Sequence, residues 1–142
     1  MNKKFSFIVI DDSELDCFVT QKFLERTDKS LIVQAFQNAE DALEMIRGNV
    51  FRDNLLPSII LLDLQMPVMN GFRFVEEFEK FPPEIRKDYK IIILTILSST
   101  SNPNELYKIL NYPEVHTIIE KPLTIEKLSS LLMYLNSDAS QK

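Results

Sequence analysis

Charged side chains stand where apolar runs of the sequence stop. Asp11 and Asp12 end the first such run, and Asp63 ends a central one. Lys121 follows the last run. Three carboxylates brought together repel one another and need a cation, and oxygen ligands of this kind suit Mg²⁺, which readily shares its coordination with a phosphate. With a lysine and a hydroxyl opposite the ion, these residue types would hold a phosphoryl group on a carboxylate, a known form of covalent catalysis.

Short apolar runs alternate with helical patterns along the chain. Strands are expected in the ranges 5–10, 31–33, 58–63, 91–97 and 115–119, and helices in the ranges 13–27, 38–48, 71–81, 102–110 and 125–135. Strict alternation predicts an α/β fold with a parallel five-stranded sheet and helices on both faces. Because the carboxyl ends of parallel strands meet at one edge, the charged residues above should gather there, where ligands of such sheets bind.

Hydrophobic spacing also predicts which faces of the helices are buried. The first helix is expected to bury Leu15, Phe18, Val19 and Phe23. Asn38 is expected to cap the second helix, which acidic residues open.

Composition narrows the class of protein. The chain has 142 residues, 45% of them hydrophobic and 26% charged, which is typical of one soluble domain. A net charge of −5 and the lack of a basic patch argue against nucleic-acid binding. The first apolar run is too short for a signal core or a membrane span, and the single cysteine fits a reducing compartment. A cytoplasmic protein without membrane contact is therefore expected.

The ordered set of motifs resembles the receiver domain of two-component response regulators. The matching residues are Asp11-Asp12, Asp63, Met66-Pro67 with Gly71, and Lys121-Pro122. The resemblance covers about residues 5–135, with a polar tail over 136–142, and implies a single domain with the flavodoxin-like strand order 2-1-3-4-5. It further implies a stand-alone receiver without an output domain.

The resemblance assigns a role to each matching residue. Asp63 would be the phosphoacceptor, and Lys121 would pair with the phosphoryl oxygens. Mg²⁺ would be held by Asp63 and Asp12, by Asp11 largely through water, and by the backbone carbonyl of Gln65. The Lys121-Pro122 peptide bond would be cis.

The family also uses a hydroxyl at the end of the fourth strand as a switch. Thr95 and Ser98 are the two candidates. Ser98 precedes Lys121 by 23 positions, close to the family spacing, and is favoured over Thr95. Receivers often carry an aromatic residue three positions before the lysine, but this sequence has Ile118 there.

The expected function is a phosphorylation switch rather than an enzyme acting on a separate substrate. A histidine kinase or phosphotransfer protein would donate the phosphoryl group. A downstream protein would bind the face made by the fourth helix, fifth strand and fifth helix, where Tyr107, Tyr112, His116 and Tyr134 are the exposed candidates. The protein would be a monomer or a phosphorylation-dependent homodimer.

Three alternatives share parts of this pattern. The first is a pseudo-receiver that binds partners without phosphorylation, which the missing aromatic residue keeps open. A phosphatase of the haloacid-dehalogenase type needs a second Asp two positions after the nucleophile, where this chain has Gln65. A flavin-binding protein would need a phosphate-cradling loop before the first helix, and the acidic residues there would repel a phosphate.

Overall fold

The computed structural model describes residues 5–49, 57–64, 71–95 and 103–140 of the chain. The strands are β1 (Ser6–Ile10), β2 (Ile32–Phe36), β3 (Ser58–Asp63), β4 (Tyr89–Thr95) and β5 (Val115–Glu120). The helices are α1 (Glu14–Thr27), α2 (Ala39–Gly48), α3 (Gly71–Phe78), α4 (Pro83–Arg86), α5 (Pro103–Leu110) and α6 (Ile125–Ser140).

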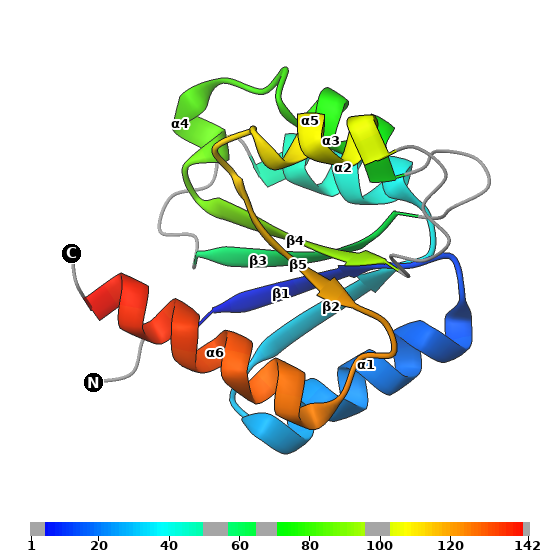
Figure 1. The fold of residues 1–142 in the computed structure, drawn as a ribbon, viewed down its shortest axis with the longest axis vertical. Coiled ribbons are helices and arrows are strands. Elements are labelled where there is room, and N and C mark those ends of the chain that lie inside the picture. Colours follow the sequence, from blue (N-terminus) through cyan, green and yellow to red (C-terminus); the bar gives the residue numbers. More distant parts are fainter. Residues whose placement is uncertain (1–4, 50–56, 65–70, 96–102, 141–142) are drawn as a thin grey trace.

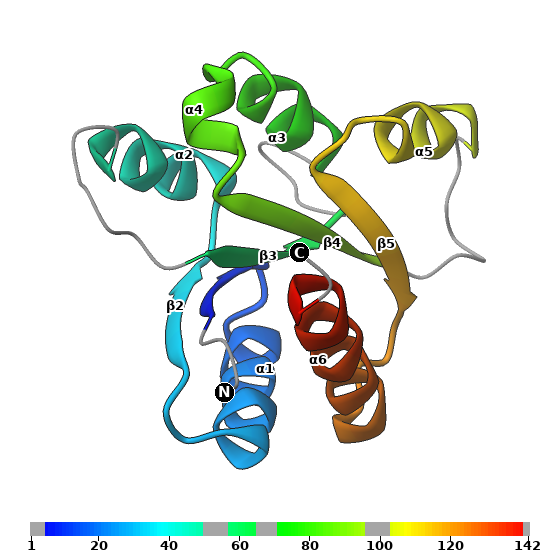
Figure 2. The same ribbon diagram turned by 90° about the vertical axis from the view of Figure 1, so that its left-hand side faces the viewer.

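All five strands form one parallel sheet in the order β2-β1-β3-β4-β5 (Figure 1). Figure 2 shows the three layers: α1 and α6 cover one face of the sheet, and α2, α3 and α5 cover the other. The predicted alternation, strand order and two-sided covering are therefore confirmed. In this arrangement the ends of β1, β3 and β4 lie at the same edge of the sheet.

The sheet separates two apolar cores, because side chains of a strand point alternately to its two faces. In β3, Ile60 and Leu62 face the core shared with α2 and α3, where Phe74 and Phe78 are fully buried. Between them, Leu61 faces the other core, under α1 and α6. Both faces of the central strands are buried, which explains their nearly unbroken apolar sequence.

The predicted buried face of α1 is wrong at Leu15 and Phe18, whereas Val19 and Phe23 are half-buried and Phe23 packs against the core under α1 and α6. Leu15 is 69% exposed and Phe18 is 55% exposed, whereas Cys17, Thr20 and Leu24 are buried. These three positions also follow helical spacing, but two of them are small or polar, so hydrophobicity alone selects the wrong stripe. Packing against the sheet and α6 decides the orientation of the helix.

Helix boundaries differ from the sequence pattern in two places. The helix predicted over 71–81 ends earlier, at Phe78, so Pro82 and Pro83 do not stop it directly; Pro83 instead begins the one-turn helix α4. At the carboxyl end, α6 continues to Ser140, into the stretch predicted as a polar tail. Asn38 caps α2 as predicted, since its side chain accepts a hydrogen bond from the backbone N–H of Asp41.

Among the described residues, no helix has the length and apolar character needed to cross a membrane.

Candidate functional site

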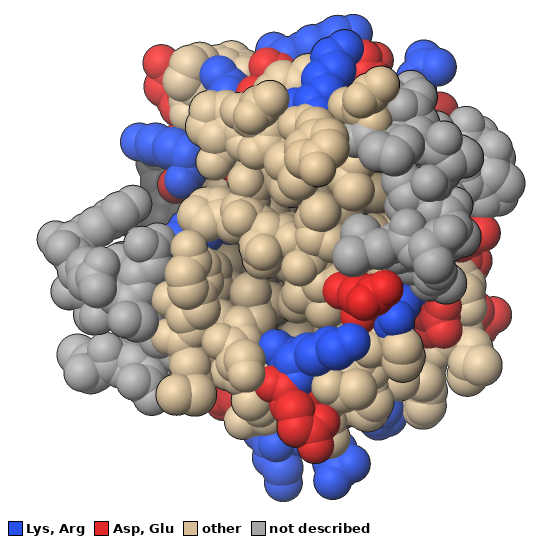
Figure 3. All heavy atoms as spheres, viewed as in Figure 1, with Lys and Arg blue, Asp and Glu red and all other residues tan. Residues whose placement is uncertain are grey.

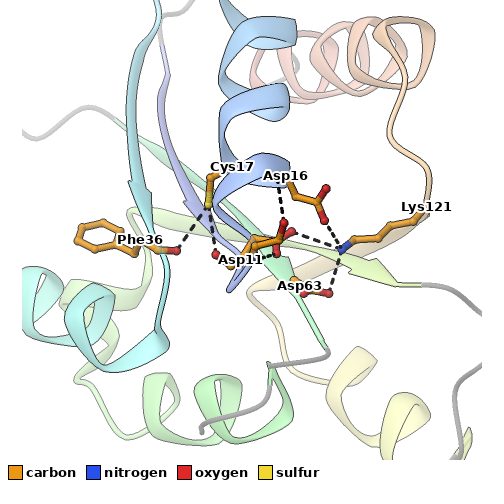
Figure 4. Close-up of polar contacts among 7 residues, drawn as sticks. Asp11, Asp16, Cys17, Phe36, Asp63 and Lys121 are labelled. Carbon is orange, nitrogen blue, oxygen red and sulfur yellow. Dashed lines mark hydrogen bonds and ion pairs between the residues drawn. The ribbon is translucent and has the colours of Figure 1, made fainter. Parts of the chain in front are cut away.

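The carboxyl-terminal ends of β1, β3 and β5 bring the predicted charged residues together. Asp11 follows β1 directly, Asp63 is the last residue of β3, and Lys121 follows β5. Figure 4 shows the three side chains converging from these separate segments. Residues 110 positions apart in sequence thus share one hydrogen bond, from Lys121 to Asp11. The predicted meeting of these strand ends is confirmed in the geometry.

Lys121 lies between the two buried carboxylates. Its Nζ is 3.2 Å from Oδ1 of Asp63 and 3.3 Å from Oδ2 of Asp11. Its backbone N–H donates to the carbonyl of Thr95 at 2.9 Å, which ties the lysine to the end of β4. The next peptide bond, Lys121–Pro122, is cis as predicted. The ammonium is therefore held at the mouth of the site by its backbone as well as by its charge.

Burial and charge oppose each other at these groups. Burial raises the pKa of the Asp11 carboxyl, although the N–H of Ser13, at 3.0 Å, and the charge of Lys121 act to lower it. Burial alone would lower the pKa of the Lys121 ammonium, but the charges and hydrogen bonds of Asp63 and Asp11 together raise it. The lysine consequently stays positive at neutral pH and compensates part of the buried negative charge.

A third carboxylate completes an acidic cluster. Ligand oxygens of Asp11, Asp12 and Asp63 lie within 4.8 Å of one another. Asp11 and Asp63 are buried, while Asp12 is exposed, so the cluster opens to solvent on one side. Carboxylate oxygens with an open side suit a hard divalent cation that keeps some of its waters. The donor set therefore fits a metal ion.

Gly71 gives the backbone of the site its close packing. A Cβ added there would lie 2.8 Å from Cα of Leu64 and 2.9 Å from the carbonyl oxygen of Asp63. Its N–H donates to the carbonyl of Leu64 at 3.0 Å, which fixes the start of α3 against the end of β3. Only a residue without a side chain allows this approach.

Of the two candidates for the switch hydroxyl, Thr95 lies within the described residues and Ser98 does not. Thr95 is the last residue of β4 and is fully buried, and its Oγ1 finds no hydrogen-bond partner among the described residues. A buried hydroxyl is normally hydrogen-bonded, so the Thr95 hydroxyl is free to donate to a ligand atom bound at the site. Ser98 and Gln65 lie outside the described residues.

Two further residues of α1, Asp16 and Cys17, contact the site. Asp16 lies in the first turn of α1, and its Oδ2 is 3.9 Å from Nζ of Lys121. Asp16 therefore attracts the same ammonium as Asp11 and Asp63 do. In the sequence, the available signal was an acidic residue only five positions after Asp11, at the start of the expected first helix. Cys17 donates its thiol to the carbonyl of Asp11 at 3.2 Å. Burial, together with the charge of Asp11, raises the pKa of this thiol to about 11, which makes it an unreactive packing residue.

Residues 7–133 match the family described as the response regulator receiver domain. The chain belongs to this family. Receiver domains serve two-component and phosphorelay signalling, and they interact with histidine kinases or phosphotransfer proteins.

Relatives of this receiver domain occur in distant organisms. It is 28% identical over 142 residues to the peroxide stress-activated histidine kinase mak1 of Schizosaccharomyces pombe, covering 97% of this chain and 8% of that protein. It is 29% identical over 134 residues to two-component response regulator 24 of Arabidopsis thaliana, covering 94% and 85% of the two chains. The chain spans between 8% and 20% of the length of the first curated relatives it matches.

A solved structure shows the same architecture. The response regulator receiver protein from Dyadobacter fermentans superposes with a TM-score of 0.75 at 29% sequence identity, over 92% of this chain and 96% of that one. The predicted family and the flavodoxin-like fold are thus confirmed.

Proposed function

We propose that the chain is a phosphorylation switch in which Asp63 accepts a phosphoryl group from a histidine kinase or phosphotransfer protein. One observation carries the proposal. The Asp63 carboxylate, only 4% exposed, has the Lys121 ammonium 3.2 Å from one oxygen and two further carboxylates within 4.8 Å. A structural ion pair would not need the two additional acids beside it, because they repel the same charge.

The proposed reaction is a direct transfer. A carboxylate oxygen of Asp63 attacks the phosphorus of the donor's phosphohistidine, the new O–P bond forms as the N–P bond breaks, and the leaving histidine nitrogen takes up a proton. Lys121 neutralises the phosphoryl oxygens as they approach, since its Nζ already lies beside the acceptor oxygen. Positioning and charge compensation supply most of the catalysis in transfers of this type.

The metal we propose is Mg²⁺. Asp12 and Asp63 would ligate it directly, Asp11 largely through water, and Gln65 through its backbone carbonyl. When bound, the ion neutralises charge on the transferring group. The three carboxylates within 4.8 Å support this ligand set.

A hydroxyl near the phosphoryl group would convert phosphorylation into a conformational change. The sequence spacing favours Ser98. The buried position of Thr95, with an oxygen that has no partner among the described residues, favours Thr95 as the residue that bonds the phosphoryl group. In either case phosphorylation shifts a population only as far as it binds the two conformations unequally.

The surface that reads the switch is proposed to lie over α5, β5 and α6, the fourth helix, fifth strand and fifth helix of the expected pattern. A groove of about 630 Å³ runs between β5 and α6 and is lined in part by Ile118, Leu131 and Tyr134. Figure 3 shows a broad surface without charged side chains across the middle of this side of the molecule. Tyr107 of α5 and Tyr134 of α6 are exposed, as predicted, and Tyr134 also lines the groove. The other two candidates, Tyr112 and His116, are half-buried.

The test is the intact mass of the protein after incubation with acetyl phosphate, with and without Mg²⁺. We expect a labile gain of one phosphoryl group that requires both Mg²⁺ and Asp63, so that Asp63→Asn gains none. Asp88→Asn is the matched control, because Asp88 lies at the other end of β3, where its carbonyl accepts from Ser58. No gain under any condition would overturn the proposal in favour of a pseudo-receiver that binds partners without phosphorylation.

A further inference from the structure

A second charged cluster lies away from the acidic site. Glu79 directly follows α3, Arg86 ends α4, and Glu114 lies in the turn before β5. Nη1 of Arg86 donates to Oε1 of Glu79 at 3.0 Å and to Oε1 of Glu114 at 2.7 Å. Nε of the same arginine donates to the carbonyl of Phe81 at 2.8 Å. One guanidinium therefore joins three segments of the chain.

The two carboxyl groups are too well buried to be ordinary surface partners. The side chain of Glu79 is 14% exposed and that of Glu114 is 11% exposed. In each, Oε2 is fully buried and finds no hydrogen-bond partner among the described residues. Two buried carboxylates with one arginine leave a net negative charge and two unsatisfied oxygens, an expensive arrangement in a poorly solvated place.

A single proton resolves both problems. If Glu79 is protonated, its hydroxyl can donate to Glu114, and the cluster of one arginine and one carboxylate becomes neutral. Burial, the hydrogen bond that protonated Glu79 can donate to Glu114, and the charge of Glu114 raise the pKa of the Glu79 carboxyl to about 7, against the opposing charge of Arg86.

Two basic side chains of the neighbouring segments, Lys80 and Arg47, pair with other carboxylates. Lys80 pairs with Glu77 on α3. Arg47 of α2 pairs with Glu44 and lies over the ring of Phe81. The charges that act on the pKa of Glu79 are those of Glu114, which raises it, and of Arg86, which lowers it.

We propose that Glu79, Arg86 and Glu114 form a proton-linked clamp, in which one proton held between the two carboxyl groups fastens the turn before β5 to the α3–α4 segment. The turn matters because the carbonyl of Glu114 accepts from the N–H of Ile91 at 2.7 Å, at the point where β4 and β5 begin to pair. Loss of the proton loosens this turn, which also follows the end of α5.

The sign of the linkage follows from the direction of the shift. The folded state binds the proton more tightly than the unfolded chain, in which Glu79 has its ordinary pKa of 4.5. Folded protein thus holds more protons between these two values, so stability falls as pH rises from about 4.5 to about 7 and then levels off.

The direct test is a carboxyl-carbon NMR titration of the full chain. We expect the Glu79 resonance to titrate near 7. Glu114→Gln should lower the Glu79 midpoint, because it removes the like charge and leaves Arg86. A Glu79 midpoint in the ordinary range in the wild type, or one that Glu114→Gln does not move, would overturn the proposal.

Stability provides the second test. The midpoint of urea unfolding should fall between pH 5.5 and pH 8.5 in the wild type. Glu79→Gln, which keeps the hydrogen bond without a charge, should remove part of that fall. Glu84→Gln, at an exposed position of α4, should leave it unchanged. An equal fall in all three proteins would show that the clamp does not couple proton binding to folding.

Discussion

Substitution of Lys121 by methionine tests how the acidic site is held together. The ammonium lies 3.2 Å from Asp63 and 3.3 Å from Asp11, both buried. Methionine keeps an unbranched apolar stem of similar reach but brings no charge. The variant therefore leaves two buried carboxylates without the cation that the described structure provides, while it disturbs the packing little.

The size of the loss in unfolding free energy follows from the distances between Nζ of Lys121 and the two carboxylates. At an effective dielectric constant of about 20, one charge pair at this distance attracts by about 5 kcal/mol, most of which the dehydration of the ions offsets. Removing one partner of a buried pair costs about 3 to 5 kcal/mol. Because the Lys121 side chain keeps 21% of its exposure, water screens the site partly. We expect a loss of about 2 to 3 kcal/mol in unfolding free energy.

Urea unfolding with and without Mg²⁺ measures the effect. The loss should appear in full in the presence of a chelator. Added Mg²⁺ should stabilise the variant more than the wild type, since the ion replaces the missing positive charge. An ion at about 100 times its dissociation constant adds about 2.7 kcal/mol.

Lys22→Met serves as the control, because Lys22 is exposed and pairs with Glu25 at 3.5 Å. An exposed pair is worth less than about 1 kcal/mol, and this variant should respond to Mg²⁺ as the wild type does. Two results would contradict a charge-compensating role of Lys121: a Lys121→Met variant as stable as the wild type without Mg²⁺, or an equal stabilisation of both proteins by Mg²⁺.

Three further outcomes are expected. Gly71→Ala should destabilise the fold by about 1 to 3 kcal/mol in urea unfolding, because its Cβ would overlap the backbone of Asp63 and Leu64; an unchanged midpoint would contradict the close approach. Thr95→Ala should abolish the phosphorylation-dependent change in amide exchange of α5 without preventing phosphoryl uptake. If only Ser98→Ala has this effect, Ser98 and not Thr95 is the switch hydroxyl. Tyr107→Ala and Tyr134→Ala should each weaken either partner binding or self-association of the phosphorylated protein, measured by sedimentation; if neither changes, the recognition surface lies elsewhere.

The acidic site could be predicted from sequence because the topology of the sheet alone brings its residues together. Once the alternating pattern fixes a parallel sheet, Asp11, Asp63 and Lys121 must meet at one edge. Each of them directly follows or ends an apolar run, so a small error in a strand boundary does not move it away. Gly71 was identified as part of the motif, but the close contact that requires it is visible only in three dimensions.

Other features depend on packing that a single sequence does not encode locally. The buried stripe of α1 contains Cys17 and Thr20, so a search for large apolar residues selects Leu15 and Phe18 instead. Hydrophobic spacing shows which side chains favour burial, whereas the neighbouring sheet and helix decide which side of α1 is covered.

The clamp of Glu79, Arg86 and Glu114 was also hidden from sequence reasoning. Its members are separated by 7 and 28 positions and lie at the borders of elements, where charged residues are normally solvated. Only the tertiary structure shows that one arginine serves both acids.

Identification of the phosphorylated side chain tests the central claim most directly. An acyl phosphate on aspartate is reduced by borohydride to homoserine, which peptide mass spectrometry locates in the chain. After phosphorylation with acetyl phosphate and Mg²⁺, we expect homoserine at position 63 and at no other carboxylate of the cluster. Homoserine at position 11 or 12, or its absence from a protein that has gained a phosphoryl group, would contradict the role assigned to Asp63.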